Sequence, residues 1–178
     1  MKLAPGMLAA LLVSGAAAAA GDVDSASNLW ARCAGRLGVA VDQPVRTRRF
    51  GETTAMTQLL LPLILAGEKT ITTTSPWLYE RDPSAKPTEG AYSIVLDETG
   101  VPRAVLRTIA VKTLPFDAVT EEDSRYKGPT VRPIEAWREV HVRYFTRVLA
   151  RVGKVLTPDM PVTLERFEVV CRADDPAD

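Results

Sequence analysis

Two strand-like segments joined by a short link constrain the fold of this chain most. Residues 92–97 and 103–112 are rich in apolar and β-branched residues, and only residues 98–102, which include Gly100, separate them. So short a link joins neighbouring antiparallel strands, whereas parallel strands need a crossover of about a dozen or more residues. We therefore expect an antiparallel sheet and not a doubly wound parallel one.

Helical patterns flank this hairpin on both sides. One helix is predicted over residues 24–37, and a second carries apolar residues at helical spacing and stops near Gly67. A short helix is expected over 117–126 and a longer one from Pro133 onward. The apolar stripe of the second helix consists of Met56, Leu59, Leu60, Leu63 and Ile64.

Further strands are predicted over 69–74 and 162–171, and residues 44–50 read as extended. Residues 76–90 are rich in proline and charge and read as a loop. Helices beside a small, mostly antiparallel sheet define an α+β fold, and this sheet is long enough to curl into an incomplete β-barrel.

The first twenty residues read as a cleavable secretory signal. Lys2 precedes an apolar run over 7–13, and alanines occupy 16–20, so that a cut after Ala20 would satisfy the preference for small residues. The alternative is a wrongly assigned start codon followed by an alanine-rich tail. The organisation we expect is a signal peptide over 1–20 and one domain over 21–178, exported to the periplasm or secreted. No other segment is long enough to span a membrane.

The net charge of the chain argues against long nucleic-acid duplexes as a partner. Without Lys2 the chain has 21 basic and 22 acidic residues, a net charge of −1, whereas proteins that hold long duplexes carry a basic excess. Any nucleic-acid partner must therefore bind through a local group of basic residues and not through the net charge of the protein. Basic residues cluster at Arg46, Arg48 and Arg49 and again at Arg103, Arg107 and Lys112, but a solvated strand edge explains both clusters equally well.

Cysteine and histidine counts limit the covalent and metal chemistry. Cys33 and Cys171 are the two cysteines, and an even number in an exported chain is compatible with a disulfide, but two buried free thiols fit the same sequence equally well. One histidine and two distant cysteines do not make a tetrahedral ligand set, so we expect no metal site. Glycine-rich phosphate loops and Gly-x-Ser-x-Gly motifs are absent, and no cofactor is expected.

The junction after the second helix is the best candidate for chemistry. Gly67 allows a sharp turn, and strand alternation places Thr70 and Thr72 on one face and Lys69 on the other. A bend at Lys69 would bring its amine beside Thr72. A desolvated amine can act as a base toward a hydroxyl or stay charged and hold a phosphate. The competing interpretation is a solvated lysine beside a threonine-rich strand.

An ordered series of motifs makes the chain resemble a known family. The segments 50–53, 65–72 and 90–97 resemble the ASCH domain family, relatives of the PUA RNA-binding domain, in its larger bacterial form. The resemblance covers about residues 28–171. Further matching positions are Gly100-Val101-Pro102, Thr108, Val111, Phe116, Val119, Trp137-Arg138, His141, Tyr144-Phe145 and Glu165-Arg166-Phe167.

This resemblance implies a PUA-like β-barrel with flanking helices and a cleft lined by the glycine-lysine-threonine turn. Family members are linked to RNA binding, to RNA cleavage and to hydrolysis of the acetyl amide of acetylated cytidine. Lys69 would be the cleft lysine and Thr72 the hydroxyl that it activates. Amidohydrolase members place a glutamate where this chain has Lys127, so Glu122 or a neighbouring carboxylate would have to substitute.

Several other side chains are predicted to contact a ligand. Lys69, Arg125 and Lys127 converging on one cleft would favour a phosphate, and Gly67 and Thr70 belong to the same turn. Trp77 or Tyr79 would stack on a base, unless both aromatic rings are packed inside the protein. His141 shares a helix face with apolar residues, which favours a structural role over a proton relay.

The leading hypothesis is an ASCH domain that binds RNA, a nucleotide or a modified nucleoside in the cleft of Lys69 and Thr72. The first alternative is a hydrolase, either a ribonuclease or an acylated-nucleoside amidohydrolase, that uses the same two residues. The second is an exported interaction module that has lost the ancestral ligand. The sequence does not indicate an oligomeric state.

Overall fold

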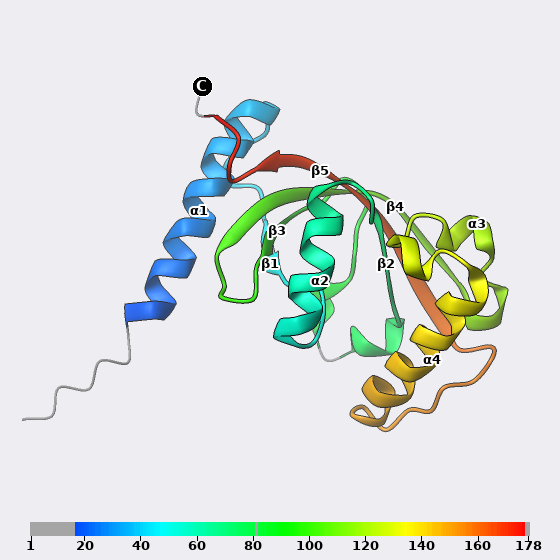
Figure 1. Ribbon diagram of the computed structural model, residues 1–178. Helices are drawn as coiled ribbons and strands as arrows, with labels where there is room; N and C mark the ends of the chain where they lie inside the picture. The colour runs from blue at the N-terminus through cyan, green and yellow to red at the C-terminus, as the bar shows by residue number, and fades with distance from the viewer. Residues whose placement is uncertain (1–16, 81, 177–178) are drawn as a thin grey trace, which may run out of the picture.

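The computed structural model describes residues 17–80 and 82–176 and shows an α+β fold (Figure 1). Five strands form a single sheet: β1 Arg46–Arg48, β2 Ile71–Thr74, β3 Tyr92–Leu96, β4 Pro102–Pro115 and β5 Pro161–Arg172. The α-helices are α1 Ala17–Leu37, α2 Thr54–Leu65, α3 Glu121–Ser124 and α4 Ile134–Ala150. Single turns of 3-10 helix lie at Pro76–Leu78, Pro83–Ala85, Phe116–Ala118 and Pro129–Val131.

The sheet is mostly antiparallel, with the strand order β1-β3-β4-β5-β2. The expected hairpin is confirmed, because β3 pairs antiparallel with β4 and places Ile94 opposite Val105. One pairing is parallel, between the short edge strand β1 and β3. The two edge strands do not pair with each other in the described part of the chain, so the curved sheet forms an incomplete barrel, under whose long β4–β5 arch α2 lies (Figure 1).

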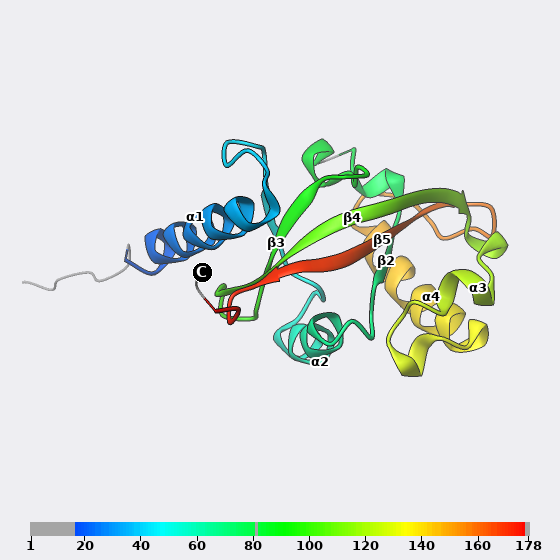
Figure 2. The same cartoon turned by 90° about the horizontal axis from the view of Figure 1, so that it is seen from above.

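Helix α1 packs at one end of the β4–β5 pair, far from α4 at the other end (Figure 2). It begins at Ala17, earlier than the predicted residue 24, because alanine favours continued helix. A disulfide joins Cys33 of α1 to Cys171 of β5. The surrounding apolar cluster contains Ala26, Leu29, Trp30, Ala34, Ile94 and Val105.

The proposed signal peptide remains a prediction. Residues 1–16 lie outside the described part of the chain, and the expected cut after Ala20 falls within the first turns of α1. Among the described residues, none of the helices has both the length and the hydropathy that crossing a membrane requires.

Helix α2 buries a different face from the predicted one. Thr53 caps it by accepting a hydrogen bond from the Met56 amide at 3.2 Å. Thr57, Leu61 and Ile64 are the buried residues, whereas Leu59 is 68% exposed. The helix is apolar on most of its circumference, so apolar spacing alone could not determine which side faces the core. The exposed apolar residues become important for the site described below.

Helix α4 buries the face that its spacing predicts. Trp137, His141, Phe145, Val148 and Leu149 are buried, and the apolar ones belong to a second core cluster together with Phe116, Val119, Met160 and Val162. The aromatic rings of Phe116 and Trp137 lie 5.2 Å apart within this cluster. A third cluster, which includes Phe50, Ile64 and Phe167, fills the space between α2 and the sheet.

Candidate functional site

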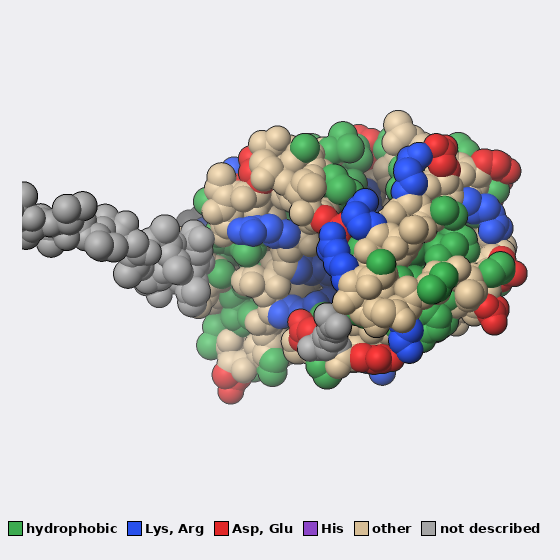
Figure 3. Space-filling view, turned by 90° about the horizontal axis from the view of Figure 1, so that it is seen from below, with side chains coloured by type: hydrophobic (Ala, Val, Ile, Leu, Met, Phe, Trp, Pro, Cys, Tyr) green, Lys and Arg blue, Asp and Glu red, His purple; other side chains and the backbone are tan. Residues whose placement is uncertain are grey.

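A cleft opens between α2, the end of β1, β2 and the middle of α4, with a volume of about 620 Å³. This volume lies within the range of small-molecule sites, roughly 300–1,000 Å³. Figure 3 shows Lys and Arg side chains gathered around the hollow on this face of the molecule. The lining residues with charged or polar side chains are Arg46, Arg48, Arg49, Glu52, Lys69, Thr72, Thr73, Thr74, Tyr79, Lys127, Thr130, His141, Tyr144 and Glu165.

Lys69 reaches this cleft because the chain reverses after α2. Gly67 takes a φ of +72°, a conformation that favours glycine, and the Lys69 amide then donates to the Leu63 carbonyl at 3.0 Å. The side chain is 5% exposed, and its Nζ donates to the carbonyl oxygen of Ile71. Burial, together with the nearby Arg48 charge, lowers the pKa of Lys69 to about 7, against a partial opposing effect of Glu165.

Thr72 lines the same cleft as Lys69 but does not bond to it. Strand β2 begins only at Ile71, so Lys69 precedes the strand and does not follow the predicted alternation. Within the described residues, the amine has a hydrogen bond to the Ile71 carbonyl and none to the Thr72 hydroxyl. Thr72 stands opposite Glu165 in the β2–β5 register, which places their side chains on one face of the sheet.

Glu165 and Arg48 form a buried ion pair across the inside of the curled sheet. Arg48 Nη1 and Nη2 donate to the two Glu165 oxygens at 2.8 and 2.9 Å, and the Thr108 hydroxyl donates to Oε1 at 2.9 Å. Burial alone would raise the pKa of Glu165, but the bonds and charge of Arg48 lower it. In a flat sheet β1 and β5 would lie about 14 Å apart, so this contact depends on curvature.

Lys127 and His141 form a second buried polar group. Lys127 Nζ donates to the Thr73 hydroxyl at 2.7 Å and lies 3.2 Å from His141 Nε2. His141 Nδ1 lies 2.7 Å from the Trp137 carbonyl, so it carries the proton and leaves Nε2 to accept from Lys127. Burial and the Lys69 charge lower the pKa of Lys127, and burial and the Lys127 charge lower that of His141.

The carboxylates of the cleft do not neutralise its two lysines. Glu165 is engaged by Arg48, and Glu52 pairs with Arg147 and with Arg151, the latter at 2.8 Å. In the part of the chain that the structure describes, no carboxylate forms an ion pair with Lys69 or Lys127. The cleft therefore has more basic groups than free carboxylates, and the two amines, whose pKa values burial lowers, hold a proton most easily when an anion lies beside them, so the cleft favours an anion.

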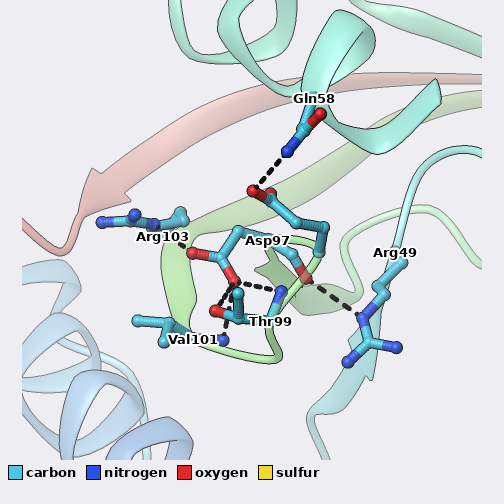
Figure 4. Close-up of polar contacts among 7 residues, drawn as sticks. Arg49, Gln58, Asp97, Thr99, Val101 and Arg103 are labelled. Carbon is cyan, nitrogen blue, oxygen red and sulfur yellow. Dashed lines mark hydrogen bonds and ion pairs between the residues drawn. The ribbon is translucent and has the colours of Figure 1, made fainter. Parts of the chain in front are cut away.

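Arg49 is held at the cleft by the β3–β4 turn (Figure 4). Its Nε donates to the Asp97 carbonyl at 3.1 Å. The Asp97 carboxylate in turn accepts from the Thr99 and Val101 amides, each at 2.9 Å, and from Arg103 Nε at 2.8 Å. These bonds explain why Arg103 does not join a ligand site and acts instead to fix the hairpin.

Five residues of the predicted site lie outside the cleft lining, and three of them, Gly67, Thr70 and Trp77, have structural roles. Gly67 is exposed and shapes the turn, and Thr70 pairs through its backbone with Tyr126 and Phe167. Trp77 packs against the aromatic cluster beside α4, with the Lys154 amine 5.3 Å from its ring centroid. Of the two aromatic residues proposed to stack on a base, only Tyr79 lines the cleft.

Glu122 and Arg125 lie in a second, smaller hollow and not beside Lys69. They form an exposed ion pair at 3.3 Å, and Arg125 stacks on Tyr126. The chain around α3 turns so that Lys127 alone points inward, and the expected convergence of Arg125 with Lys127 does not occur. Glu122 therefore does not substitute for the glutamate that amidohydrolase members have at the position of Lys127.

Sequence reasoning did not assign Glu165, Thr73 or the apolar residues of α2 to the site. Glu165 lies in a motif that matches the family, but pairing with Arg48 depends on the curvature of the sheet. The basic residues Arg46, Arg48 and Arg49 were visible as a cluster, and only the fold distinguishes a cleft from a solvated edge. Among the described residues, no group of three or more His, Cys, Asp or Glu side chains could hold a metal ion.

Fold and site together define a PUA-like α+β domain with a buried cationic cleft. The ASCH domain model matches residues 46–171, and the chain belongs to the ASCH domain family. This family is associated with RNA binding.

Two solved structures share the fold of this chain. One is the protein EF3133 from Enterococcus faecalis V583, with 27% identity and a TM-score of 0.75 over 84% of this chain and 90% of that one. The other is an ASCH domain from Lactobacillus crispatus JV V101, with 20% identity and a TM-score of 0.74 over 83% and 95% of the two chains. Among curated proteins, none matches.

Proposed function

We propose that this protein binds RNA, a nucleotide or a modified nucleoside in the cleft of Lys69 and Thr72. The observation that carries the proposal is the pair of buried lysine amines without a carboxylate partner in the described structure. A buried ammonium group is unfavourable unless an anion accompanies it. A phosphate or another anionic group of a ligand would supply that partner.

The polar groups around the two amines suit a nucleotide-like ligand. Thr72 offers a hydroxyl, and Arg46 adds a half-buried guanidinium whose pKa burial and Arg48 lower. Tyr79 presents an aromatic ring, and burial raises its pKa to about 12, so its hydroxyl remains a hydrogen-bond donor at neutral pH. Stacking on an aromatic ring contributes about 1–3 kcal/mol per base.

Titration with short oligoribonucleotides and with nucleosides tests this proposal. Lys69→Met removes the buried amine and keeps an unbranched chain of similar length. Lys86→Met makes the same substitution at an exposed lysine outside the cleft lining and serves as the control. We expect the first variant to weaken binding at least tenfold, about 1.4 kcal/mol, and the second to leave it unchanged. Negligible binding by wild type and both variants would remove the proposal.

A second candidate function, hydrolysis of RNA or of an acylated nucleoside, is favoured by the pKa of Lys69. At a pKa of about 7 the amine is partly neutral at physiological pH and can accept a proton. Thr72 supplies a hydroxyl in the same cleft. Product formation should then fall in both Lys69→Ala and Thr72→Ala, and unchanged rates in both variants would exclude this assignment.

We also propose that the protein is exported and cleaved after Ala20. The disulfide between Cys33 and Cys171 supports this location, because disulfides persist in oxidising compartments. Mass spectrometry of the protein from its host should find a chain that begins at residue 21. An intact Met1 on a cytoplasmic product would contradict export.

A further inference from the structure

One wall of the cleft is aliphatic: Met56 and Leu59 are exposed, and Leu60 and Leu63 are half-buried. Met56, Leu59, Leu60 and Leu63 of α2 all line it, and Leu59 is 68% exposed. Their spacing of three, four and seven residues places them along one side of the helix, over a length of about 10 Å. They therefore form a continuous apolar strip beside the polar groups and not a set of isolated surface residues.

Apolar residues outside α2 line the cleft as well. Val131 lines the cleft from the turn before α4 and Val140 from the middle of α4, and half-buried Tyr144 lies one turn beyond Val140. Gly128 also lines the cleft, and an added Cβ there would come within 2.9 Å of Leu63 Cδ1. The missing side chain at Gly128 lets this segment approach Leu63 closely.

The cationic groups share this hollow with the apolar strip. Lys69 and Lys127 lie buried within it, and Arg46 and Arg49 also line it. A nucleoside alone would use the polar groups and leave the strip in contact with water. Burial of apolar surface is favourable by about 25 cal/mol per Å², so a ligand that covers both parts binds best.

We propose that the ligand of this cleft is an amphiphilic anion, with its charged group at the lysines and an aliphatic or acyl chain along Met56, Leu59, Leu60 and Leu63. The inference rests on the proposed function, since it uses the same cleft and the same cationic groups. It adds that the nucleotide-like ligand bears an aliphatic group. Because basic groups and an apolar strip share one hollow, a ligand with an anionic head and an aliphatic chain complements both. A second copy of the chain is less favoured as the occupant, because it would have to bury the basic groups too.

Calorimetric titration with methyl phosphate and octyl phosphate measures the contribution of the chain at a constant head group. Octyl phosphate is used below its micellar concentration. We expect it to bind about tenfold or more tightly than methyl phosphate, because about 0.8 kcal/mol accompanies each fully buried methylene. Leu59→Gln should abolish this gain and leave the affinity for methyl phosphate unchanged.

Val155→Gln is the matched control, since Val155 is 75% exposed and lies outside the cleft lining. It should keep the gain of the octyl chain. Equal affinities of the two phosphates for wild type, or a gain that survives Leu59→Gln, would overturn the inference. A wild type that sediments as a dimer while Leu59→Gln sediments as a monomer would also overturn it, because the strip would then be a subunit interface.

The inference and the proposed function can fail separately. Cytidine monophosphate that binds wild type and not Lys69→Met, without any gain from the octyl chain, removes the inference alone. The opposite result is also possible: octyl phosphate binds more tightly than methyl phosphate, Leu59→Gln abolishes this difference, and no nucleotide or oligoribonucleotide binds. That result would contradict the proposed nucleotide-like ligand and support an amphiphilic anion.

Discussion

Arg48 and Glu165 show how one buried pair can organise the cleft. Glu165 is 2% exposed, and Arg48 and Thr108 satisfy its oxygens. The Arg48 guanidinium also lies 4.5 Å from the ring centroid of Phe50, a residue of the segment that joins β1 to α2. Because the carboxylate is occupied, it does not neutralise Lys69 fully, and the lysine remains available to a ligand.

Arg48→Met should therefore lower the free energy of unfolding by about 3–5 kcal/mol, since it leaves Glu165 buried without its cation. Urea denaturation measures the effect. Arg143→Met removes an arginine whose partner, Glu139, is exposed, and it should cost less than about 1 kcal/mol. Similar losses in the two variants would contradict the account of the buried pair.

Lys69→Met should stabilise the protein in a pH-dependent way. The amine has a pKa of about 7 in the folded state and 10.5 unfolded, so the unfolded chain binds more protons between these values. Wild-type stability then rises with pH through this window, by up to about 1.4 kcal/mol per unit, whereas below pH 7 the cost of burying the charge is fully present. The variant lacks this dependence.

Urea denaturation of both proteins at pH 6, 7, 8 and 9 measures the difference. The stability gained by Lys69→Met should be largest at pH 6 and should shrink as the pH rises. A gain that stays constant over these four values would show that the folded amine does not titrate near 7.

At the scale of elements, the hairpin could be predicted and the orientation of α2 could not. A five-residue link between two β-rich segments permits essentially one local pairing, and β3 and β4 adopt it. Helix α2 is apolar on most sides, so its buried face depends on contacts with distant strands. The same limit applies to Lys127 and Arg125, since only the turn after α3 determines which of them points inward.

Gly51 fixes the start of α2 and so the position of the apolar strip. Its φ is +94°, and an added Cβ would lie 2.7 Å from Met56 Cβ and 2.9 Å from the Thr57 amide nitrogen. Gly51→Ala should cost about 2–3 kcal/mol, because backbone strain and this clash act together.

Gly90→Ala is the control for Gly51→Ala, since Gly90 has a φ of +81° and open space around its Cα. It should show backbone strain alone, about 1–2 kcal/mol. Thermal unfolding of both variants separates the two contributions. Equal losses would mean that the clash with α2 is relieved without cost.

At the scale of the whole molecule, the disulfide ties α1 to the C-terminal end of β5 across 138 residues of sequence. The sequence left the disulfide and two free thiols equally plausible, because the approach of the two segments depends on the complete fold. The α+β class was predictable from the order of helices and strands, and the PUA-like fold was predictable from the resemblance to the ASCH family. Replacement of both cysteines by serine should lower the free energy of unfolding by about 4–5 kcal/mol, measured by urea denaturation against wild type.

A reductant provides the check on this prediction. Wild type treated with dithiothreitol should approach the stability of the double variant, and the double variant should not respond. A wild type whose stability is the same with and without reductant would show that the bridge does not contribute to stability in solution.

The central claim is that a buried lysine amine in the cleft receives an anionic ligand, and its most direct test is the pH dependence of binding. A dinucleoside monophosphate keeps one phosphate charge between pH 6 and 8, while the protonated fraction of a group with a pKa of about 7 falls about tenfold. Calorimetry should show that the affinity of wild type falls about tenfold from pH 6 to pH 8. The affinity of Lys69→Met should be weaker than that of wild type at pH 6 and should not change with pH. Equal affinities of the two proteins at pH 6 would contradict the account.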